Sequence, residues 1–371
     1  MMKLLILLTT YNTVENQIYY NWQEIGLGKA LSNIGNKVDI YITVGESTET
    51  EKQLNKNLSI FYKPCVFLGN NGLIDLEKLN TDYDAAIHFA DTQLSVPRIY
   101  SWCRRNDIKY TPYIGCVEST SANAFIRIAI NLHYRRNKGI YRKCLCLAKN
   151  ATIADTLRKQ GTRRIALAPV GLDIDLLKQN FESFDRKSLR VKWGYSEDDK
   201  VILFIGRLES EKRPLDMLRL FVQLHSMDSS YRLLIVGSGK LLSTITQHIE
   251  TNNLSELVQH IERIANVDIW ELHKISDCFV NLRTTEIFGM AILEAMYYRT
   301  TVVAFKSPCA CTIIDDGLDG YLVDSDEEFL ASVLAPINLN MKEAAHQKIV
   351  DNFTWEKTAN LIADYLAEKI G

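Results

Sequence analysis

The sequence has neither an excess of positive charge nor a long apolar run near its start. It has 43 Lys and Arg residues and 45 Asp and Glu residues, which gives a net charge of -2. A dedicated nucleic-acid binder, by contrast, is strongly basic. The apolar run Leu4–Leu8 is far too short to cross a bilayer, and turn residues rather than a small-residue cleavage site follow it. We therefore expect a cytoplasmic protein that binds no nucleic acid and begins with a buried strand.

The sequence also lacks the second ligand cluster that a zinc site requires. Eight cysteines are present, and four of them form the C-x-C pairs Cys144/Cys146 and Cys309/Cys311. Such spacing can supply metal ligands, but no C-x2-C or H-x3-H pair accompanies it. Without a recognisable secretion signal the compartment is expected to be reducing, so buried free thiols are the favoured interpretation.

No internal repeat and no low-complexity tract interrupts the 371 residues, a length that favours two domains. Short β-branched runs alternate with segments of helical periodicity in both halves, which predicts parallel βαβ units in doubly wound sheets. The predicted strands of the first half are 4–8, 37–44, 83–88, 109–114, Thr152–Ala154 and 165–168, and those of the second half are 201–205, 232–236, 258–261, 278–282 and 302–305.

The stretch 276–305 combines a buried strand, a polar turn, a helix and a second strand. Glu286 lies in the turn and Glu294 lies eight positions later, about 80° away if both are on one helix. Amides at the helix start lack intrahelical partners, and Gly289 has no side chain to block a ligand from approaching them. Two solvated helix carboxylates are the alternative, but the position between buried strands favours a binding site.

The motif E-x-F-G-x4-E-A-M, which starts at Glu286, resembles the E-x7-E motif of retaining GT-B glycosyltransferases of family 4. By this resemblance, Glu294 holds the nucleotide ribose and Glu286 holds the sugar. The backbone amides that assist Glu286 belong to Phe288, Gly289, Met290 and Ala291.

The resemblance implies the GT-B fold, in which two Rossmann-like α/β domains face a central cleft. Residues 1–172 are then the acceptor domain and residues 173–354 the nucleotide-sugar domain. The final helix, within 355–371, is expected to pack back on the acceptor domain.

A second motif, from Gly206 to Lys212, follows a predicted strand and resembles the family's G-R-L-x-x-x-K. In the family it supplies an Arg and a Lys to the nucleotide diphosphate, here Arg207 and Lys212. The diphosphate gains negative charge as it leaves, and fixed cations stabilise it. A solvated loop is the alternative. Arg263 and Ile264 follow another predicted strand, where the family binds the base.

Neither a metal nor an organic cofactor is expected. The run after Val236 has two glycines, Gly237 and Gly239, but Leu242 stands where the dinucleotide fingerprint requires a third. Family members of this fold act without a metal, because helix-end amides and the Arg/Lys pair replace it.

The first half departs from the family at two points. Many members have a Gly-Gly loop after the first strand and a His near the position of Ile114, and this chain has neither. His88 and Asp91, at the end of an earlier strand, are the acceptor-side candidates because the carboxyl ends of parallel strands line ligand sites. A His88 held by neighbours in a structural role is the alternative.

Residues 127–149 carry many basic residues and no acidic one. The basic and histidine positions are Arg127, His133, Arg135, Arg136, Lys138, Arg142, Lys143 and Lys149, and Ile128, Ile130, Leu132, Tyr134, Ile140 and Tyr141 interleave with them. Such a run predicts peripheral contact with anionic lipid at the inner face of the membrane. A basic solvated helix face is the alternative.

Taken together, these motifs predict a retaining, hexosyltransferase-type glycosyltransferase with a nucleotide-sugar donor, and a UDP-sugar is the expected one. The acceptor is expected to be a glycan or a lipid-linked glycoconjugate, in surface polysaccharide or glycoconjugate biosynthesis. A GT-B nucleotide-sugar epimerase and a catalytically silent partner subunit are the alternatives. The donor motifs argue against both, whereas the missing Gly-Gly loop and His favour the silent subunit.

Overall fold

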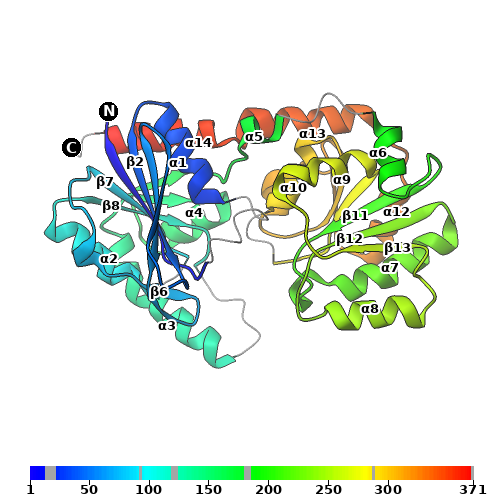
Figure 1. Ribbon diagram of the computed structural model, residues 1–371, viewed down its shortest axis with the longest axis horizontal. Coiled ribbons are helices and arrows are strands. Elements are labelled where there is room, and N and C mark those ends of the chain that lie inside the picture. Colours follow the sequence, from blue (N-terminus) through cyan, green and yellow to red (C-terminus); the bar gives the residue numbers. More distant parts are fainter. Residues whose placement is uncertain (13–21, 92–93, 118–123, 179–184, 286–288, 369–371) are drawn as a thin grey trace. The chain divides into compact units, whose positions relative to one another are not determined.

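The computed structural model describes residues 1–12, 22–91, 94–117, 124–178, 185–285 and 289–368. These residues form two compact units (Figure 1). Unit 1 takes the described residues up to Gly171 and from Phe353 onward, and unit 2 takes those within Leu172–Asn352. The sequence-based limits, 172 and 354, lie one and two residues away.

Unit 1 is built on a sheet with the strand order β10-β9-β8-β7-β1-β2-β4-β3. Its strands pair in parallel except β3, which runs antiparallel to β4. The strands are β1 Lys3–Leu8, β2 Lys37–Val44, β3 Thr50–Asn55, β4 Leu58–Pro64, β7 Ala85–Phe89, β8 Lys109–Ile114, β9 Cys146–Ala148 and β10 Ile165–Leu167, and a separate hairpin joins β5 Val66–Leu68 to β6 Asn71–Leu73.

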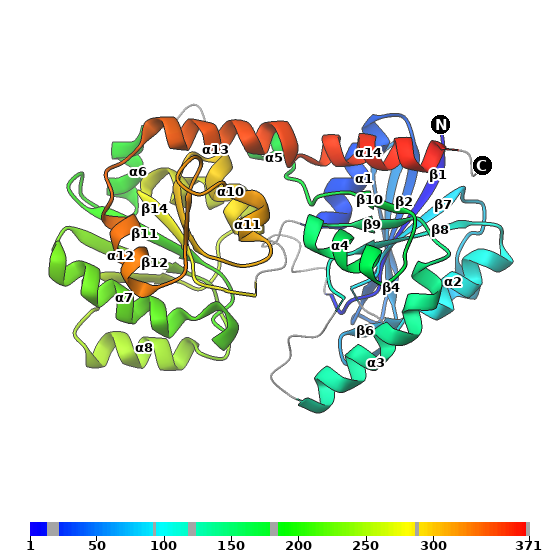
Figure 2. The same cartoon turned by 180° about the vertical axis from the view of Figure 1, so that it is seen from behind.

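Helices cover both faces of this sheet, as in Figures 1 and 2. The helices are α1 Gln23–Asn33, the 3-10 turn Leu76–Lys78, α2 Val96–Arg105, α3 Ala124–Tyr141, α4 Ala151–Lys159 and α14 Trp355–Ala367. Trp102 of α2 and Tyr134 of α3 belong to one buried core, together with Leu5 and Leu7 of β1. All four residues of the run Leu4–Leu7 are fully buried, because parallel strands covered on both faces are apolar without alternation.

The structure corrects one predicted strand of unit 1. Thr152–Ala154 was expected to be a strand, but these residues form the first turn of α4, and the strand β9 precedes them. The Asn150 side chain accepts a hydrogen bond from the Ile153 amide at 2.9 Å and so caps the helix. The buried strand is supplied by the apolar residues just before this cap.

The C-terminal helix α14 packs on α1 of unit 1. Gly26 of α1 makes room for Trp355, since a Cβ atom on Gly26 would lie 2.2 Å from the indole Nε1. Thr358 Oγ1 donates a hydrogen bond to the Pro169 carbonyl at 2.6 Å, and Lys109 Nζ donates one to the Leu366 carbonyl at 2.7 Å. Close packing and polar contacts therefore hold α14 to this unit.

Unit 2 is built on a fully parallel sheet with the order β13-β12-β11-β14-β15-β16. Its strands are β11 Lys200–Ile205, β12 Tyr231–Val236, β13 Val258–Ile261, β14 Cys278–Asn281, β15 Thr301–Phe305 and β16 Tyr321–Val323. Helices α7 Pro214–Met227, α8 Leu242–Thr251 and α12 Asp326–Leu334 cover one face (Figures 1 and 2). The other face is covered by α6 Arg186–Lys192, α9 Ile269–Ile275, α10 Met290–Tyr297 and α13 Leu339–Asn352.

The helices of unit 2 follow the strands in the order expected of βαβ units. They are α5 Ile174–Lys178, α6 Arg186–Lys192, α7 Pro214–Met227, α8 Leu242–Thr251, α9 Ile269–Ile275, α10 Met290–Tyr297, α11 Ala310–Ile313, α12 Asp326–Leu334 and α13 Leu339–Asn352, with short 3-10 turns at Ser210–Lys212 and Asn266–Asp268.

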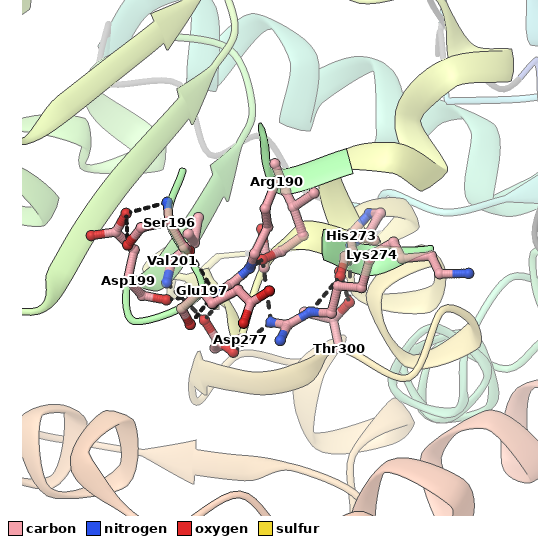
Figure 3. Close-up of polar contacts among 12 residues, drawn as sticks. Arg190, Ser196, Glu197, Asp199, Val201, His273, Lys274, Asp277 and Thr300 are labelled. Atoms are coloured by element: carbon pink, nitrogen blue, oxygen red, sulfur yellow. Dashed lines mark hydrogen bonds and ion pairs between the residues drawn. The ribbon is translucent and has the colours of Figure 1, made fainter. Parts of the chain in front are cut away.

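A buried arginine ties α6 to the amino edge of the unit 2 sheet (Figure 3). Arg190 donates hydrogen bonds to the carboxylate of Asp277 at 2.7 Å and to the backbone carbonyls of Ser196, Glu197, Asp199 and Ile275. Asp277 also accepts from the Val201 amide at 2.8 Å. These contacts lie where β11 and β14 begin, so they do not involve the carboxyl ends of the two strands.

Each sheet has one point where the strand order reverses. In unit 1 this point lies between β1 and β7, and in unit 2 it lies between β11 and β14. Ligands of open α/β sheets bind outside the carboxyl ends of the strands at such a point. These two places are therefore where functional residues are expected.

Candidate functional site

Two loops pack tightly at the reversal point of unit 2, and glycine permits their contact. The Gly206 amide donates a hydrogen bond to the Val236 carbonyl at 3.0 Å, and the Leu208 amide donates one to the Ser238 carbonyl at 2.9 Å. A Cβ atom on Gly237 would lie 1.9 Å from the Gly206 carbonyl oxygen. The two glycines after β12 thus serve loop packing, in keeping with the failed dinucleotide fingerprint.

A carboxylate joins the cations on the two sides of the reversal point. Glu211 accepts a hydrogen bond from Arg207 at 3.1 Å and another from Arg283 at 3.2 Å. The Arg207 side chain is 65% exposed and can reach a ligand, whereas that of Arg283 is 11% exposed. Sequence analysis missed Arg283, whose only signal is its place directly after β14.

Lys212 and its neighbour Arg213 complete the loop after β11. The Lys212 stem passes over Gly206, where a Cβ atom would lie 3.5 Å from Lys212 Cδ. Arg213 has a φ of 57°, in the left-handed region that side chains rarely adopt. Its guanidinium lies 4.8 Å from the Phe305 ring centroid and donates to Asp216 at 2.8 Å. These contacts fix the turn that presents Lys212.

Helix α10 carries the second donor motif. Glu294 is buried within it at 7% exposure, and Gly289 stands immediately before its first residue. The Gly289 amide donates a hydrogen bond to Cys309 Sγ at 3.1 Å, a contact that a ligand at this amide would have to replace. Met290 and Ala291 begin the helix. Glu286 and Phe288 lie outside the described residues.

The residues predicted to bind the base follow β13. Arg263 is exposed and Ile264 is half-buried. His260, within β13, contacts the Gly237 carbonyl through Nε2 at 2.8 Å, and Ser238 Oγ donates to Glu262 Oε1 at 3.0 Å. The end of β13 is therefore joined to the loop after β12.

In unit 1, His88 is fully buried near the carboxyl end of the interior strand β7. Its Nδ1 lies 2.8 Å from the Tyr110 hydroxyl, and its Nε2 lies 3.3 Å from both Thr9 Oγ1 and Ser95 Oγ. Burial lowers the pKa of His88 to about 3, so the ring is neutral at ordinary pH. This environment favours the structural role over the acceptor-side role.

Asp91, two residues beyond β7, lies at the reversal point of unit 1. Its Oδ1 accepts hydrogen bonds from the Gly115 amide at 2.7 Å and the Cys116 amide at 3.2 Å. Its Oδ2 accepts from Lys149 Nζ at 2.7 Å. The Lys149 side chain is 2% exposed, so the expectation that it belongs to a basic surface is wrong.

The other basic residues of the run lie on or beside α3. Among the helix positions whose burial the structure describes, Tyr134, Asn137 and Tyr141 are buried, whereas Arg135 and Arg136 are exposed. Three large apolar side chains on its first turns are also exposed: Phe125 at 85%, Ile128 at 66% and Leu132 at 64%. Their spacing of three and four residues places them along one side of the helix.

No group of three or more His, Cys, Asp or Glu side chains that could hold a metal ion occurs within the described ranges. Of the four cysteines in C-x-C pairs, Cys144, Cys146 and Cys309 are buried free thiols, and Cys311 is an exposed one. Burial raises the pKa of the Cys144 thiol to about 12.

Comparison with known proteins relates most of unit 2 to a protein family. Residues 185–363 match the family described as Glycosyl transferases group 1. The match makes this part of the chain similar to that family. The matched region contains the loop from Gly206 to Lys212, the turn after β14 and helix α10.

Two curated relatives are similar over part of the chain. Alpha-monoglucosyldiacylglycerol synthase of Acholeplasma laidlawii is 21% identical over 228 residues, which are 61% of this chain and 56% of the relative. D-inositol 3-phosphate glycosyltransferase of Geodermatophilus obscurus is 28% identical over 218 residues, which are 55% of this chain and 48% of the relative. The chain spans about half the length of the curated relatives it matches.

A solved structure resembles the whole chain. Anabaena Alr3699/HepE, in complex with UDP-glucose, aligns with a TM-score of 0.75 at 17% identity and covers 100% of both chains. At this identity the likeness concerns the fold. The predicted fold is confirmed: the protein has the GT-B fold, with two Rossmann-like α/β units.

Proposed function

We propose that the protein is a retaining glycosyltransferase of family 4 that uses a UDP-sugar donor. The observation that carries the proposal is the reversal point of unit 2. Arg207 and Lys212 lie in the loop after β11, and the buried Glu294 lies in α10, which follows the neighbouring strand β14 within the region that matches Glycosyl transferases group 1. The UDP-glucose bound to Alr3699/HepE, a protein of the same fold, supports the choice of nucleotide.

In this proposal Arg207 and Lys212 bind the diphosphate. The bond from the sugar carbon to the diphosphate oxygen breaks, its electron pair leaves with UDP, and the two cations stabilise the added charge. The acceptor oxygen forms the new bond to the same sugar carbon and gives its proton to the departing phosphate. Glu294 accepts hydrogen bonds from the ribose hydroxyls. Glu286 and the amides from Phe288 to Ala291 stay predictions for the sugar.

The acceptor in this proposal is a glycan or a lipid-linked glycoconjugate, as in surface polysaccharide or glycoconjugate biosynthesis at the inner face of the membrane. One relative is named for a glycosylated diacylglycerol and another for an inositol phosphate. The names of these relatives thus point to different acceptors.

Release of UDP, followed with and without acceptors, tests the proposal against its alternatives. The protein is incubated with UDP-glucose, UDP-galactose and UDP-N-acetylglucosamine, and free UDP and sugar products are both measured. A glycosyltransferase releases UDP faster with acceptor and yields a product of retained anomeric configuration. An epimerase interconverts UDP-sugars without acceptor, and a silent subunit does neither, so either result would contradict the proposal.

We also propose that unit 1 contacts anionic lipid through α3. Exposed Phe125, Ile128 and Leu132 supply an apolar strip, and Arg135 and Arg136 continue from it. In the described part of the chain no helix is long and apolar enough to cross a bilayer. Contact at the interface is therefore the form of membrane binding proposed, with apolar side chains inserted and basic ones near lipid phosphates.

Sedimentation with vesicles tests the membrane contact. Binding should require anionic lipid and weaken as salt shortens the Debye length from about 10 Å at 0.1 M to about 3 Å at 1 M. Replacement of Phe125, Ile128 and Leu132 by Ser should release the protein, and so should replacement of Arg135 and Arg136. UDP affinity should stay unchanged in both variants. A native protein that never sediments with anionic vesicles would leave α3 as a solvated face.

A further inference from the structure

Three neighbouring strand ends and one helix start meet at the reversal point of unit 1. Asp91 follows β7, Gly115 and Cys116 follow β8, Lys149 follows β9, and Gln23 begins α1. Lys149 Nζ donates hydrogen bonds to Asp91 Oδ2 at 2.7 Å and to Gln23 Oε1 at 3.2 Å. One ammonium group therefore links the ends of two strands to the helix that follows β1.

Lys149 is held as a fixed charge. Its Nζ lies 5.0 Å from the Phe89 ring centroid and 4.9 Å from that of Tyr113, while its side chain is 2% exposed. Buried cations require paired anions, because desolvation costs several kcal/mol per ion. The Asp91 carboxylate meets this requirement and still has 32% of its side chain exposed. The buried cation thus fixes a carboxylate that stays accessible.

A second carboxyl lies close to Lys149 but is poorly suited to balance its charge. Glu24 of α1 is buried at 4% exposure, and its Oε1 has no hydrogen-bond partner within the part of the chain that the structure describes. Burial raises the pKa of Glu24 to about 7, against the attraction of Lys149. Glu24 is therefore protonated in part at neutral pH, and Asp91 is the carboxylate that pairs with Lys149.

We infer that Asp91 binds the hydroxyl group of the acceptor that receives the sugar, and that Lys149 is the residue that positions Asp91. The inference rests on the proposed function and names the acceptor's chemical class: a neutral polyhydroxy group, such as a sugar ring. Because 32% of the Asp91 side chain is exposed, a hydroxyl group can reach its carboxylate and donate a hydrogen bond, whereas the carboxylate repels anions. Lys149 is already paired and does not touch the acceptor.

The first test needs no turnover. Saturation-transfer NMR measures binding of the methyl glycosides of glucose, galactose and N-acetylglucosamine to the full chain with UDP present, and malate is the anionic probe. At least one glycoside should bind the native protein, and Asp91→Asn should weaken it about 10- to 100-fold, because a hydrogen bond to a charged acceptor is lost. Equal binding by Asp91→Asn, binding of malate alone, or no glycoside binding would overturn the inference.

The second test separates positioning from mere stability. Lys149→Met should raise the acceptor KM about tenfold with less effect on kcat, and Lys149→Arg should restore part of it. Because Lys149 acts through Asp91, the double variant Asp91→Asn/Lys149→Met should be no worse than Asp91→Asn alone. It also leaves no unpaired buried charge, so it keeps the test valid if Lys149→Met fails to fold.

Controls distinguish this inference from the proposed function. Asp155→Asn and Lys159→Met alter exposed residues of α4 in the same unit and should change neither acceptor KM nor UDP affinity. UDP affinity should also stay within about twofold in every Asp91 and Lys149 variant, because the donor site lies in unit 2. Native protein that turns over no UDP-sugar contradicts the proposed function. Native turnover with full activity in Asp91→Asn contradicts only the inference.

Discussion

Burial sets the charge of several single side chains in this protein. It raises the pKa of Glu24 to about 7 and lowers the pKa of both His88 and His273 to about 3. The two histidines are therefore neutral at ordinary pH. Glu24 ionises near neutrality, in a place where its charge is poorly solvated.

Glu24→Gln should make the protein less sensitive to rising pH. The folded pKa of Glu24 lies above its unfolded value of 4.5, so its contribution to stability is fully present below pH 4.5 and is lost as pH rises through about 7. The variant, compared with the native protein, should gain about 2 kcal/mol in unfolding free energy between about pH 5 and about pH 8. Urea unfolding at several pH values measures this. If the difference in unfolding free energy between the variant and the native protein did not change with pH, Glu24 would not be a buried carboxyl that titrates near neutral pH.

At the scale of elements, the Asp277 cluster holds α6 to the unit 2 sheet through arginines of unequal burial. Arg190 and Arg186 both bind the Asp277 carboxylate, but the Arg190 side chain is 3% exposed and that of Arg186 is 44% exposed. Arg190→Lys should cost about 3 kcal/mol or more, because several carbonyls and part of the carboxylate lose their partner. Arg186→Lys, the matched control, should cost about 1 kcal/mol or less. Equal urea midpoints for the two variants would show that the burial of the arginine does not determine how much stability its replacement costs.

The elements themselves were largely predictable from sequence. Apolar runs bounded by turns identified ten of the strands, including all of unit 2 except β16, which has only three residues. The prediction of a strand at Thr152–Ala154 was wrong because the Asn150 side chain caps a helix, so that these residues begin α4. Strands β3 to β6 carry weaker patterns and were not predicted.

The site was predictable where it rests on local motifs and not where it rests on tertiary contacts. Local motifs that resemble those of a family pointed to Arg207, Lys212 and Glu294, which lie in the loop after β11 and in α10 after β14, while their roles stay predictions. Lys149 was misassigned because sequence shows its charge but not the pairing with Asp91, which lies 58 residues away. Cys309 was missed as a partner of Gly289 for the same reason.

At the scale of the whole molecule, the proposed chemistry depends on protein cations rather than on a metal. Arg207 and Lys212 offer the charge that a divalent ion would otherwise supply to the diphosphate. Sugar transfer by the native protein should therefore proceed at an unchanged rate in EDTA. Loss of activity in EDTA that magnesium or manganese restores would contradict this.

The central claim is that a nucleotide-sugar site lies at the reversal point of unit 2. The most direct test is calorimetric titration of UDP into the native protein and into Glu294→Ala. Native protein should bind UDP, and Glu294→Ala should weaken binding about 10- to 150-fold, because the ribose hydroxyls lose a charged acceptor worth about 1.5–3 kcal/mol. Asp155→Asn, in unit 1, should bind like the native protein. No UDP binding to the native protein, or equal affinity in Glu294→Ala, would contradict the account.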